Sequence, residues 1–327
     1  MSLAASVRAA VQRRSLVGAP RVEVRAAASE LARLGGGAVL GIVFFGSRRS
    51  GAARADSWSA HDFFVIVRAY RPFFEALRAQ GAIHRGANLM AAVSHILPPS
   101  QVSLHLDREG APPFHAKCSV IELETFERET SPRRRDHFCI GRLFQPSEVV
   151  YAADEAVGDR LLDALVSAHL ETYTWIRPWL EAPFDVERYC LTLLRVSLSQ
   201  EIRPEPEGRA QALFAAQRAE IVPVYEVLLA GLVAAGELRL DPGGLTLAHP
   251  VGFAERLRLR AYFWRSLVRA TVRWVKHVVT FEGWLDYIVR KVRRHGGEEI
   301  ELSPRERRMP LLFLWPRLFK YLRQKNR

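Results

Sequence analysis

Residues 38–67 constrain the fold of this chain most strongly, because they place two buried-strand patterns on either side of a polar loop. Residues 39–45 and 63–67 are apolar runs rich in β-branched and aromatic side chains, which is typical of buried strands. Gly46-Ser47 follows the first run, and Asp62 stands where the second begins. We therefore expect a small residue, a hydroxyl group and a carboxylate to meet at one edge of a sheet.

Such an arrangement suits a phosphate chain together with a metal ion. Glycine lets the backbone approach closely, backbone N–H groups and the Ser47 hydroxyl can bond phosphate oxygens, and the Asp62 carboxylate can bind Mg²⁺. Arg48, Arg49 and Arg54 lie in the same loop and can contact phosphates. An ordinary hairpin with a solvated basic loop is the alternative that these residues leave open.

The overall charge favours an anionic partner. The chain has 327 residues with a formal net charge of +12, and 49% of its residues are hydrophobic, so it is long and apolar enough for two or three globular domains. The positive charge suits nucleic acid, an anionic membrane or phosphorylated substrates. Three cysteines, at positions 118, 139 and 190, lack metal-ligand spacing. That pattern predicts a reducing, cytoplasmic compartment with buried thiols.

The first predicted domain, residues 1–152, is an α/β unit with a mixed sheet and flanking helices. Apolar spacing predicts a leading N-terminal helix and further helices over 22–34, 72–80, 87–96 and from 123. Further strands are expected over 102–106, 114–121 and 149–151.

Two more domains are predicted after residue 152. Helices over 159–180, 185–200 and 209–235, followed by a hairpin of 238–240 with 245–247, indicate a winged-helix-like middle domain over 153–250. Residues 251–327 form a basic helical region in which Arg and Lys, among them Arg269, Arg273 and Lys276, alternate with aromatic residues. Such a region suits docking on an anionic membrane; a core helix or an RNA-binding face are the alternatives.

Two tracts then carry a resemblance to a known family. Residues 114–126 read FHAKCSVIELETF and residues 136–150 read DHFCIGRLFQPSEVV. They resemble the mitochondrial CDP-diacylglycerol synthase family of the nucleotidyltransferase superfamily, which has a Lys-Tyr-Gly-Val strand and a later Gly-Arg-Leu-x-Lys-Pro-Val tract. Lys117 matches the lysine and Gly141-Arg142-Leu143 matches directly, whereas Cys118-Ser119 and Gln145-Pro146 depart from the pattern.

Two further motifs of that family have counterparts here. Phe45-Gly46-Ser47 looks like its Tyr-Gly-Ser, and His61-Asp62-Phe63 looks like its apolar-Asp-Phe strand. Ser197, Glu201 and Arg203 fall on its Ser-x-x-x-Asp-x-Arg pattern, with Glu in place of Asp. The resemblance spans roughly residues 38–235 and depends on the order and spacing of four motifs.

The resemblance implies an activity and a set of site residues. Such enzymes join CTP to phosphatidic acid, give CDP-diacylglycerol and pyrophosphate, need Mg²⁺ and work at a membrane surface without spanning it. A bacterial relative would then be cytoplasmic and peripherally bound to the inner membrane, with no obligate protein partner. The implied catalytic residues are Asp62, Lys117 and Arg142; the nucleotide-binding residues are Gly46, Ser47, Arg48, Glu201 and Arg203; the metal ligands are Asp62 and Asp56.

One departure favours an alternative. Nucleotidyltransferases generally carry two acids on the second strand, but Ala60 stands two residues before Asp62. Asp56 is the expected substitute, and Glu122 or Glu124 is a further candidate acid. The alternative function is therefore an RNA-directed or catalytically inactive relative that binds nucleic acid. On the structural reading Lys117 is a solvent-facing lysine, Arg142 a salt-bridge residue, and Glu201 with Arg203 a structural pair.

Overall fold

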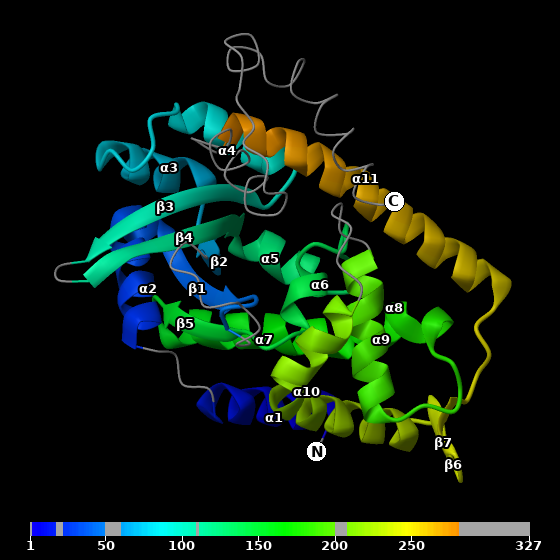
Figure 1. Ribbon diagram of the computed structural model, residues 1–327. Coiled ribbons are helices and arrows are strands. Elements are labelled where there is room, and N and C mark those ends of the chain that lie inside the picture. The colour runs from blue at the N-terminus through cyan, green and yellow to red at the C-terminus, as the bar shows by residue number, and fades with distance from the viewer. Residues whose placement is uncertain (1, 18–21, 50–59, 109–110, 200–207, 281–327) are drawn as a thin grey trace.

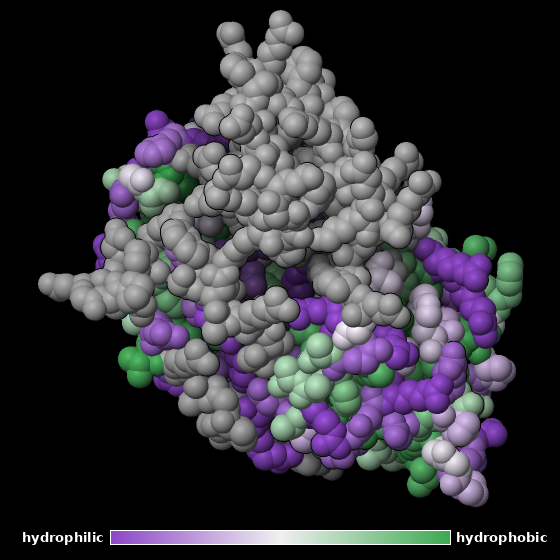
Figure 2. All heavy atoms as spheres, in the orientation of Figure 1, coloured by the Kyte–Doolittle hydropathy of each residue, from purple (hydrophilic) through white to green (hydrophobic). Residues whose placement is uncertain are grey.

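The computed structural model describes residues 2–17, 22–49, 60–108, 111–199 and 208–280 (Figures 1 and 2). Three predicted site residues, Asp56, Glu201 and Arg203, lie outside the described residues, as does the segment 281–327. The statements below concern the described part of the chain.

The N-terminal unit is built on a mixed five-stranded sheet, as predicted. Its strand order is β3-β4-β2-β1-β5, and β2 and β4 are parallel while the other neighbours are antiparallel. The strands are β1 (Val39–Phe45), β2 (His61–Val67), β3 (Ser100–Arg108), β4 (Ala111–Glu122) and β5 (Glu148–Ala152). The second predicted strand begins two residues earlier than expected, so Asp62 lies inside β2.

Helices cover both faces of the sheet (Figure 1). One face packs on α2 (Val22–Gly35), α3 (Tyr70–Ala79) and α4 (Ala87–Ile96). The other packs on α5 (Leu123–Glu129), α6 (Ile140–Leu143) and α7 (Glu155–Leu170), and α1 (Leu3–Val17) lies against α7. Because strand side chains alternate, Phe63 and Val65 face the first group, whereas Phe64 and Ile66 face the second.

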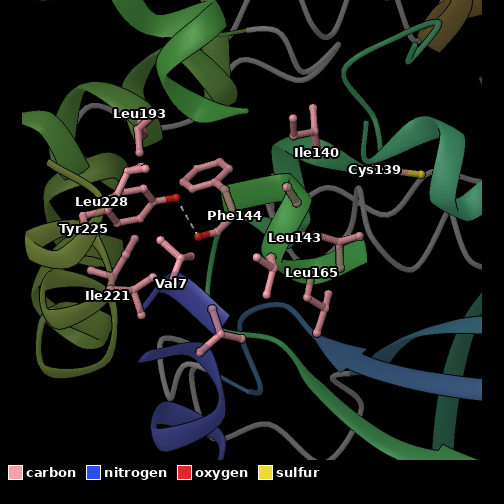
Figure 3. Close-up of a cluster of buried hydrophobic side chains, with 14 of the residues drawn as sticks. Val7, Cys139, Ile140, Leu143, Phe144, Leu165, Leu193, Ile221, Tyr225 and Leu228 are labelled. Atoms are coloured by element: carbon pink, nitrogen blue, oxygen red, sulfur yellow. Dashed lines mark hydrogen bonds between the residues drawn. The ribbon is translucent and has the colours of Figure 1, made fainter. Parts of the chain in front are cut away.

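A helical region follows the sheet. It contains α8 (Thr172–Ile176), the 3₁₀ turn η2 (Arg177–Trp179), α9 (Val186–Ser199), α10 (Arg209–Ala234), the hairpin β6 (Leu238–Asp241) with β7 (Gly244–Leu247), and α11 (Phe253–Thr280). The hairpin was predicted. One buried cluster joins this region to the sheet, and within it the Tyr225 hydroxyl donates to the Phe144 carbonyl at 3.2 Å (Figure 3). The cluster runs across the predicted boundaries at 152 and 250.

The single helix predicted over 159–180 is wrong. The helix α7 begins earlier, because the carboxylate of Asp154 accepts a hydrogen bond from the Val157 amide at 2.8 Å and caps the first turn. The chain then leaves α7 after Leu170 and continues as α8. At this break the Thr172 hydroxyl donates to the His169 carbonyl at 2.6 Å, replacing part of the regular backbone pattern.

A buried arginine–histidine contact fixes α1 against α7. Arg14 Nη1 lies 2.9 Å from His169 Nε2, and His169 Nδ1 lies 2.7 Å from the Leu165 carbonyl oxygen. Because an arginine can only donate, Nε2 accepts and the Nδ1–H donates to Leu165. Burial, reinforced by the Arg14 charge, lowers the pKa of His169 to about 3, so the imidazole is neutral in the folded protein.

This contact predicts a specific loss of stability in acid. The unfolded chain takes up a proton on His169 near the ordinary pKa of 6.5, whereas the folded protein does not until its lowered pKa is reached. His169 therefore stabilises the fold above the ordinary pKa, and this contribution is lost as the pH falls toward the folded value. The substitution His169→Gln keeps an acceptor for Arg14. It should make the slope of unfolding free energy against pH shallower by about 1.4 kcal/mol per pH unit between about pH 6 and 4.

Urea unfolding across this pH range measures the slope. Leu89→Gln, at an exposed residue of α4 that does not titrate, is the control for introducing glutamine and should leave the slope unchanged. Equal slopes for the wild type and His169→Gln would contradict the assignment.

Candidate functional site

The parallel register of β2 and β4 places Asp62 directly opposite Lys117. Their side chains lie on one face of the sheet, the face that also carries Phe64 and Ile121. Lys117 Nζ is 3.9 Å from Asp62 Oδ1, and the two side chains are 43% and 29% exposed. The sheet therefore presents an acid and a cation together at a solvent-accessible position.

Gly46 completes this arrangement from the end of β1. Phe45 pairs with Asp62, so the chain leaves β1 beside the carboxylate. Gly46 has φ +89°, and a Cβ at this position would lie 2.8 Å from Asp62 Oδ2. Both facts require glycine here. Ser47 and Arg48 follow in the turn and are partly buried. The structure thus brings Gly46, Asp62 and Lys117 together, as predicted, with Ser47 and Arg48 next in the chain.

Arg49, which the sequence offered as a phosphate contact or a solvated residue, has a different role. Its side chain is 5% exposed and makes paired hydrogen bonds of 3.1 and 2.8 Å to Glu220 on α10. Its Nε also lies 3.5 Å from a carboxylate oxygen of Glu148 on β5. Burial raises the pKa of Glu148 to about 7, while the Arg49 charge opposes the shift. Arg49 therefore anchors the turn of Gly46 to the helical region.

Arg142 lies on the short helix α6, which sequence analysis did not assign. Its Nη1 donates to the Phe138 carbonyl at 2.9 Å, and its Cζ lies 3.9 Å from the centroid of the Phe138 ring. The preceding residue, Gly141, accepts a hydrogen bond of 3.0 Å from the Ser197 hydroxyl. A Cβ on Gly141 would lie 2.8 Å from that hydroxyl oxygen. Two motif residues far apart in sequence, Gly141 and Ser197, are therefore in direct contact.

The Phe138 ring relates Arg142 to the sheet pair. It packs edge-on against the Phe64 ring, with centroids 6.2 Å apart. Phe64 is two residues beyond Asp62 on the same face, a separation of about 7 Å along the strand. The Phe138 ring thus connects Arg142 to the sheet face that carries Asp62 and Lys117. Three predicted motif positions, at 46, 62 and 117, gather at this face, and position 142 is connected to it.

Glu122 and Glu124, the further candidate acids, lie away from Asp62. Glu122 is opposite Val67, at the far end of β2 from Asp62, and its carboxylate accepts from the Tyr70 amide at 3.3 Å. Glu124 is exposed on the first turn of α5. The prediction of a third acid from these residues is therefore wrong, because β4 carries them away from the site.

The described residues fit a magnesium ion held partly by substrate. Within the described ranges no group of three or more His, Cys, Asp or Glu side chains could hold a metal ion. Mg²⁺ at nucleotide sites usually takes one or two carboxylates and completes its shell with phosphate oxygens and water. Asp62 supplies one carboxylate, and the missing Cβ of Gly46 keeps the backbone close to it.

Sequence analysis missed the contribution of α11. Arg273 Nη2 donates to Asp136 Oδ2 at 2.6 Å, and Arg273 Cζ lies 4.6 Å from the Phe138 ring centroid. The helical spacing of the basic residues indicated this contribution. Arg269, Arg273 and Lys276 share the helix face that also buries apolar residues such as Phe263.

No protein-family model matches the chain, and no curated protein matches it. The functional inference therefore depends on how these side chains are arranged.

The close approach of Gly46 to Asp62 predicts the effect of a single methyl group. Gly46→Ala should lower the free energy of unfolding by at least about 1 kcal/mol more than Gly81→Ala. Gly81 also has positive φ, +69°, but a Cβ there would have no heavy atom within 4 Å. The difference between the two variants, measured by urea unfolding, isolates the contact with Asp62. In an Asp62→Ala background the two costs should converge, and an unchanged difference there would contradict the geometry.

Proposed function

We propose that the chain is a Mg²⁺-dependent nucleotidyltransferase that transfers the cytidylyl group of CTP to phosphatidic acid. The products are CDP-diacylglycerol and pyrophosphate. The observation that carries the proposal is the convergence of Gly46, Asp62 and Lys117 on one accessible sheet edge, with Arg142 connected to the same face through the Phe138 ring. The mixed sheet with helices on both faces is compatible with a nucleotidyltransferase fold, which we include in the proposal.

The reaction joins two anions, so its main needs are charge neutralisation and alignment. A phosphate oxygen of phosphatidic acid attacks the α-phosphorus of CTP. The bond between that phosphorus and the oxygen that bridges the α- and β-phosphates breaks. Pyrophosphate leaves with that oxygen, and no side-chain nucleophile is required. Bound Mg²⁺ would neutralise charge on the triphosphate.

Each residue of the site has a role suited to this reaction. Asp62 would hold the metal, and the Gly46 backbone with the Ser47 hydroxyl would bind the departing phosphates. Lys117 would neutralise charge that develops on the triphosphate, and the planar guanidinium of Arg142 suits a phosphate group.

The outer face of α11 supports a membrane-surface substrate. We call its exposed apolar row Phe253, Leu257, Trp264, Val268 and Val272 the outer stripe. These residues recur at helical spacing on one face, and exposed arginines at 256, 258, 260 and 265 flank them. Figure 2 shows hydrophobic and hydrophilic side chains next to each other at the end of the molecule where α11 begins. Apolar side chains with flanking cations are typical of helices that lie on anionic membranes. No described helix is both long and apolar enough to cross a bilayer.

The proposed activity is tested with labelled CTP and phosphatidate liposomes. The full-length protein with Mg²⁺ should form a labelled CDP-lipid, and Asp62→Ala and Lys117→Met should each reduce the rate at least about 100-fold. Asp159→Ala removes an exposed acid on α7 and should leave the rate within about twofold of wild type. Absence of labelled lipid with the wild type, or an Asp62→Ala rate equal to wild type, would reject the proposal.

The membrane contact is tested by co-sedimentation with anionic vesicles. Trp264→Glu should weaken binding to phosphatidate-containing vesicles at least about fivefold, because it places a charge in the apolar outer stripe. The matched control is Leu240→Glu, at an equally exposed apolar residue on the β6–β7 hairpin. A parallel gel shift with transfer RNA tests the nucleic-acid alternative. RNA binding that falls steeply with salt, together with no preference for phosphatidate vesicles, would favour that alternative.

A further inference from the structure

Two guanidinium groups from distant parts of the chain share one aromatic ring. Arg142 Cζ lies 3.9 Å, and Arg273 Cζ 4.6 Å, from the centroid of the Phe138 ring. Arg142 comes from α6, whereas Arg273 comes from the inner face of α11 and is 2% exposed. Each cation gains from the ring, and the two like charges repel each other in a region of low dielectric. Such a pair is suited to an anion.

Arg273 is held rigidly and yet keeps unused donors. Its Nη2 donates to the Pro98 carbonyl at 2.9 Å and to Asp136 Oδ2 at 2.6 Å. Its Nε and Nη1 are buried and have no hydrogen-bond partner among the described residues. Together these two nitrogens carry three N–H bonds, which buried groups normally satisfy. The side chain is thus fixed in place with strong donors left for an acceptor.

The charge around Arg273 is unbalanced. Asp136, which is buried, also accepts from Arg269 Nε at 2.8 Å, so one carboxylate serves two arginines. One turn further along α11, Lys276 Nζ donates to the Pro99 carbonyl and the Ser100 hydroxyl, both at 3.0 Å. Burial, with the charges of Arg273 and Arg269, lowers the pKa of Lys276 to about 7. Within the described part of the chain, the group formed by Arg269, Arg273 and Asp136 carries one net positive charge, which favours a positive local potential.

The location connects this potential to the candidate site. The Phe138 ring packs on Phe64, which is one strand repeat from Asp62 on the same face. Through the Phe138 ring the cations of α11 connect to the sheet face that carries the Asp62–Lys117 pair, and Lys276 contacts Ser100, three residues along β3 from Ser103, the residue that pairs with Lys117. The outer stripe of the same helix is exposed to solvent. This helix therefore suits a substrate with a phosphate at one end and acyl chains at the other. Its inner cations suit the phosphate, and its outer stripe suits the acyl chains.

We propose that Arg273, together with Arg142 across the Phe138 ring, binds the phosphate monoester of the acceptor substrate. Arg273 is then a substrate-binding residue supplied by α11, which makes that helix part of the site rather than only a membrane anchor. The identity of the acceptor as phosphatidic acid rests on the proposed function, but binding of the phosphate monoester can be measured without catalysis.

A purely structural role for Arg273 makes the opposite prediction for its partner. If Arg273 only forms an ion pair with Asp136, removing either residue should have the same effect. If Arg273 binds an anion, Asp136 competes for its charge. Asp136→Asn should then leave anion binding unchanged or tighten it, whereas removal of the guanidinium should weaken it.

Calorimetric titration of the full-length protein with dihexanoyl phosphatidate, without CTP or Mg²⁺, provides the test. Arg273→Gln and Arg273→Lys should each weaken binding at least about tenfold; the lysine variant keeps a charge for Asp136 but lacks the unused guanidinium donors. Arg239→Gln, at an exposed arginine of the β6–β7 hairpin, should bind like wild type. Thermal unfolding of each variant identifies any loss of the fold.

Three outcomes overturn the proposal: Arg273→Lys that binds like wild type, Asp136→Asn that weakens binding as much as Arg273→Gln, or no phosphatidate binding by the wild type. Inorganic phosphate is titrated in a separate arm, and binding of phosphate without binding of phosphatidate also overturns it, because the ligand would then be the free anion.

The same variants distinguish this proposal from the proposed function. In the liposome assay Arg273→Lys should raise KM for phosphatidate at least about tenfold and leave KM for CTP within about twofold. If the wild type forms no CDP-lipid but binds phosphatidate through Arg273, the activity is wrong and the anion site stands. If CDP-lipid forms and Arg273→Lys binds phosphatidate normally, the activity stands and the anion site is wrong.

Discussion

The parallel pairing of β2 with β4 is the constraint on which the candidate site depends. It sets Asp62 opposite Lys117 and directs both side chains to the face that carries Phe64. A shift of one residue in the register would turn Asp62 toward the helices on the opposite face, into an apolar cluster. The register is held because Phe63 and Val65 fill that cluster while Phe64 and Ile66 fill the other, so that either face would lose its packing if the strand slipped.

A buried ion pair and a buried arginine–histidine hydrogen bond then fix the loop and the helices around this pairing. Arg49 joins the turn that contains Gly46 to Glu220 on α10, and Arg14 joins α1 to His169 on α7. Buried pairs of this kind cost desolvation and add little net stability, but removal of one partner leaves a charge that is expensive to bury. Their effect is therefore geometric: they hold the glycine turn against the sheet and tie the helical region to it, which gives the candidate site a rigid frame.

Local features of this fold could be predicted from the sequence. The strand β1 and the helix α4 have the predicted bounds, because β1 is a continuous apolar run that ends at Gly46 and α4 has helical spacing and is followed by Pro98. The placement of Gly46 and Asp62 at one edge of the sheet followed from the order of the two strand patterns and the loop between them. The break after Leu170 did not, because it depends on a side-chain hydrogen bond of Thr172 within a pattern that otherwise continues as a helix.

Long-range features could not be predicted in this way. Arg273 and Asp136 are 137 positions apart, and their contact follows from how α11 crosses the sheet, which periodicity does not encode. Glu122 was misplaced for the same reason, since its distance from Asp62 depends on which strand β2 pairs with.

The central claim is that Gly46, Asp62 and Lys117 form one site for a metal-bound triphosphate. A crystal structure with Mg²⁺ and a non-hydrolysable CTP analogue tests it most directly. We predict Mg²⁺ on Asp62 and phosphate oxygens within hydrogen-bond distance of Gly46 or Ser47 and of Lys117; a nucleotide bound elsewhere, with this sheet edge empty, would contradict the account.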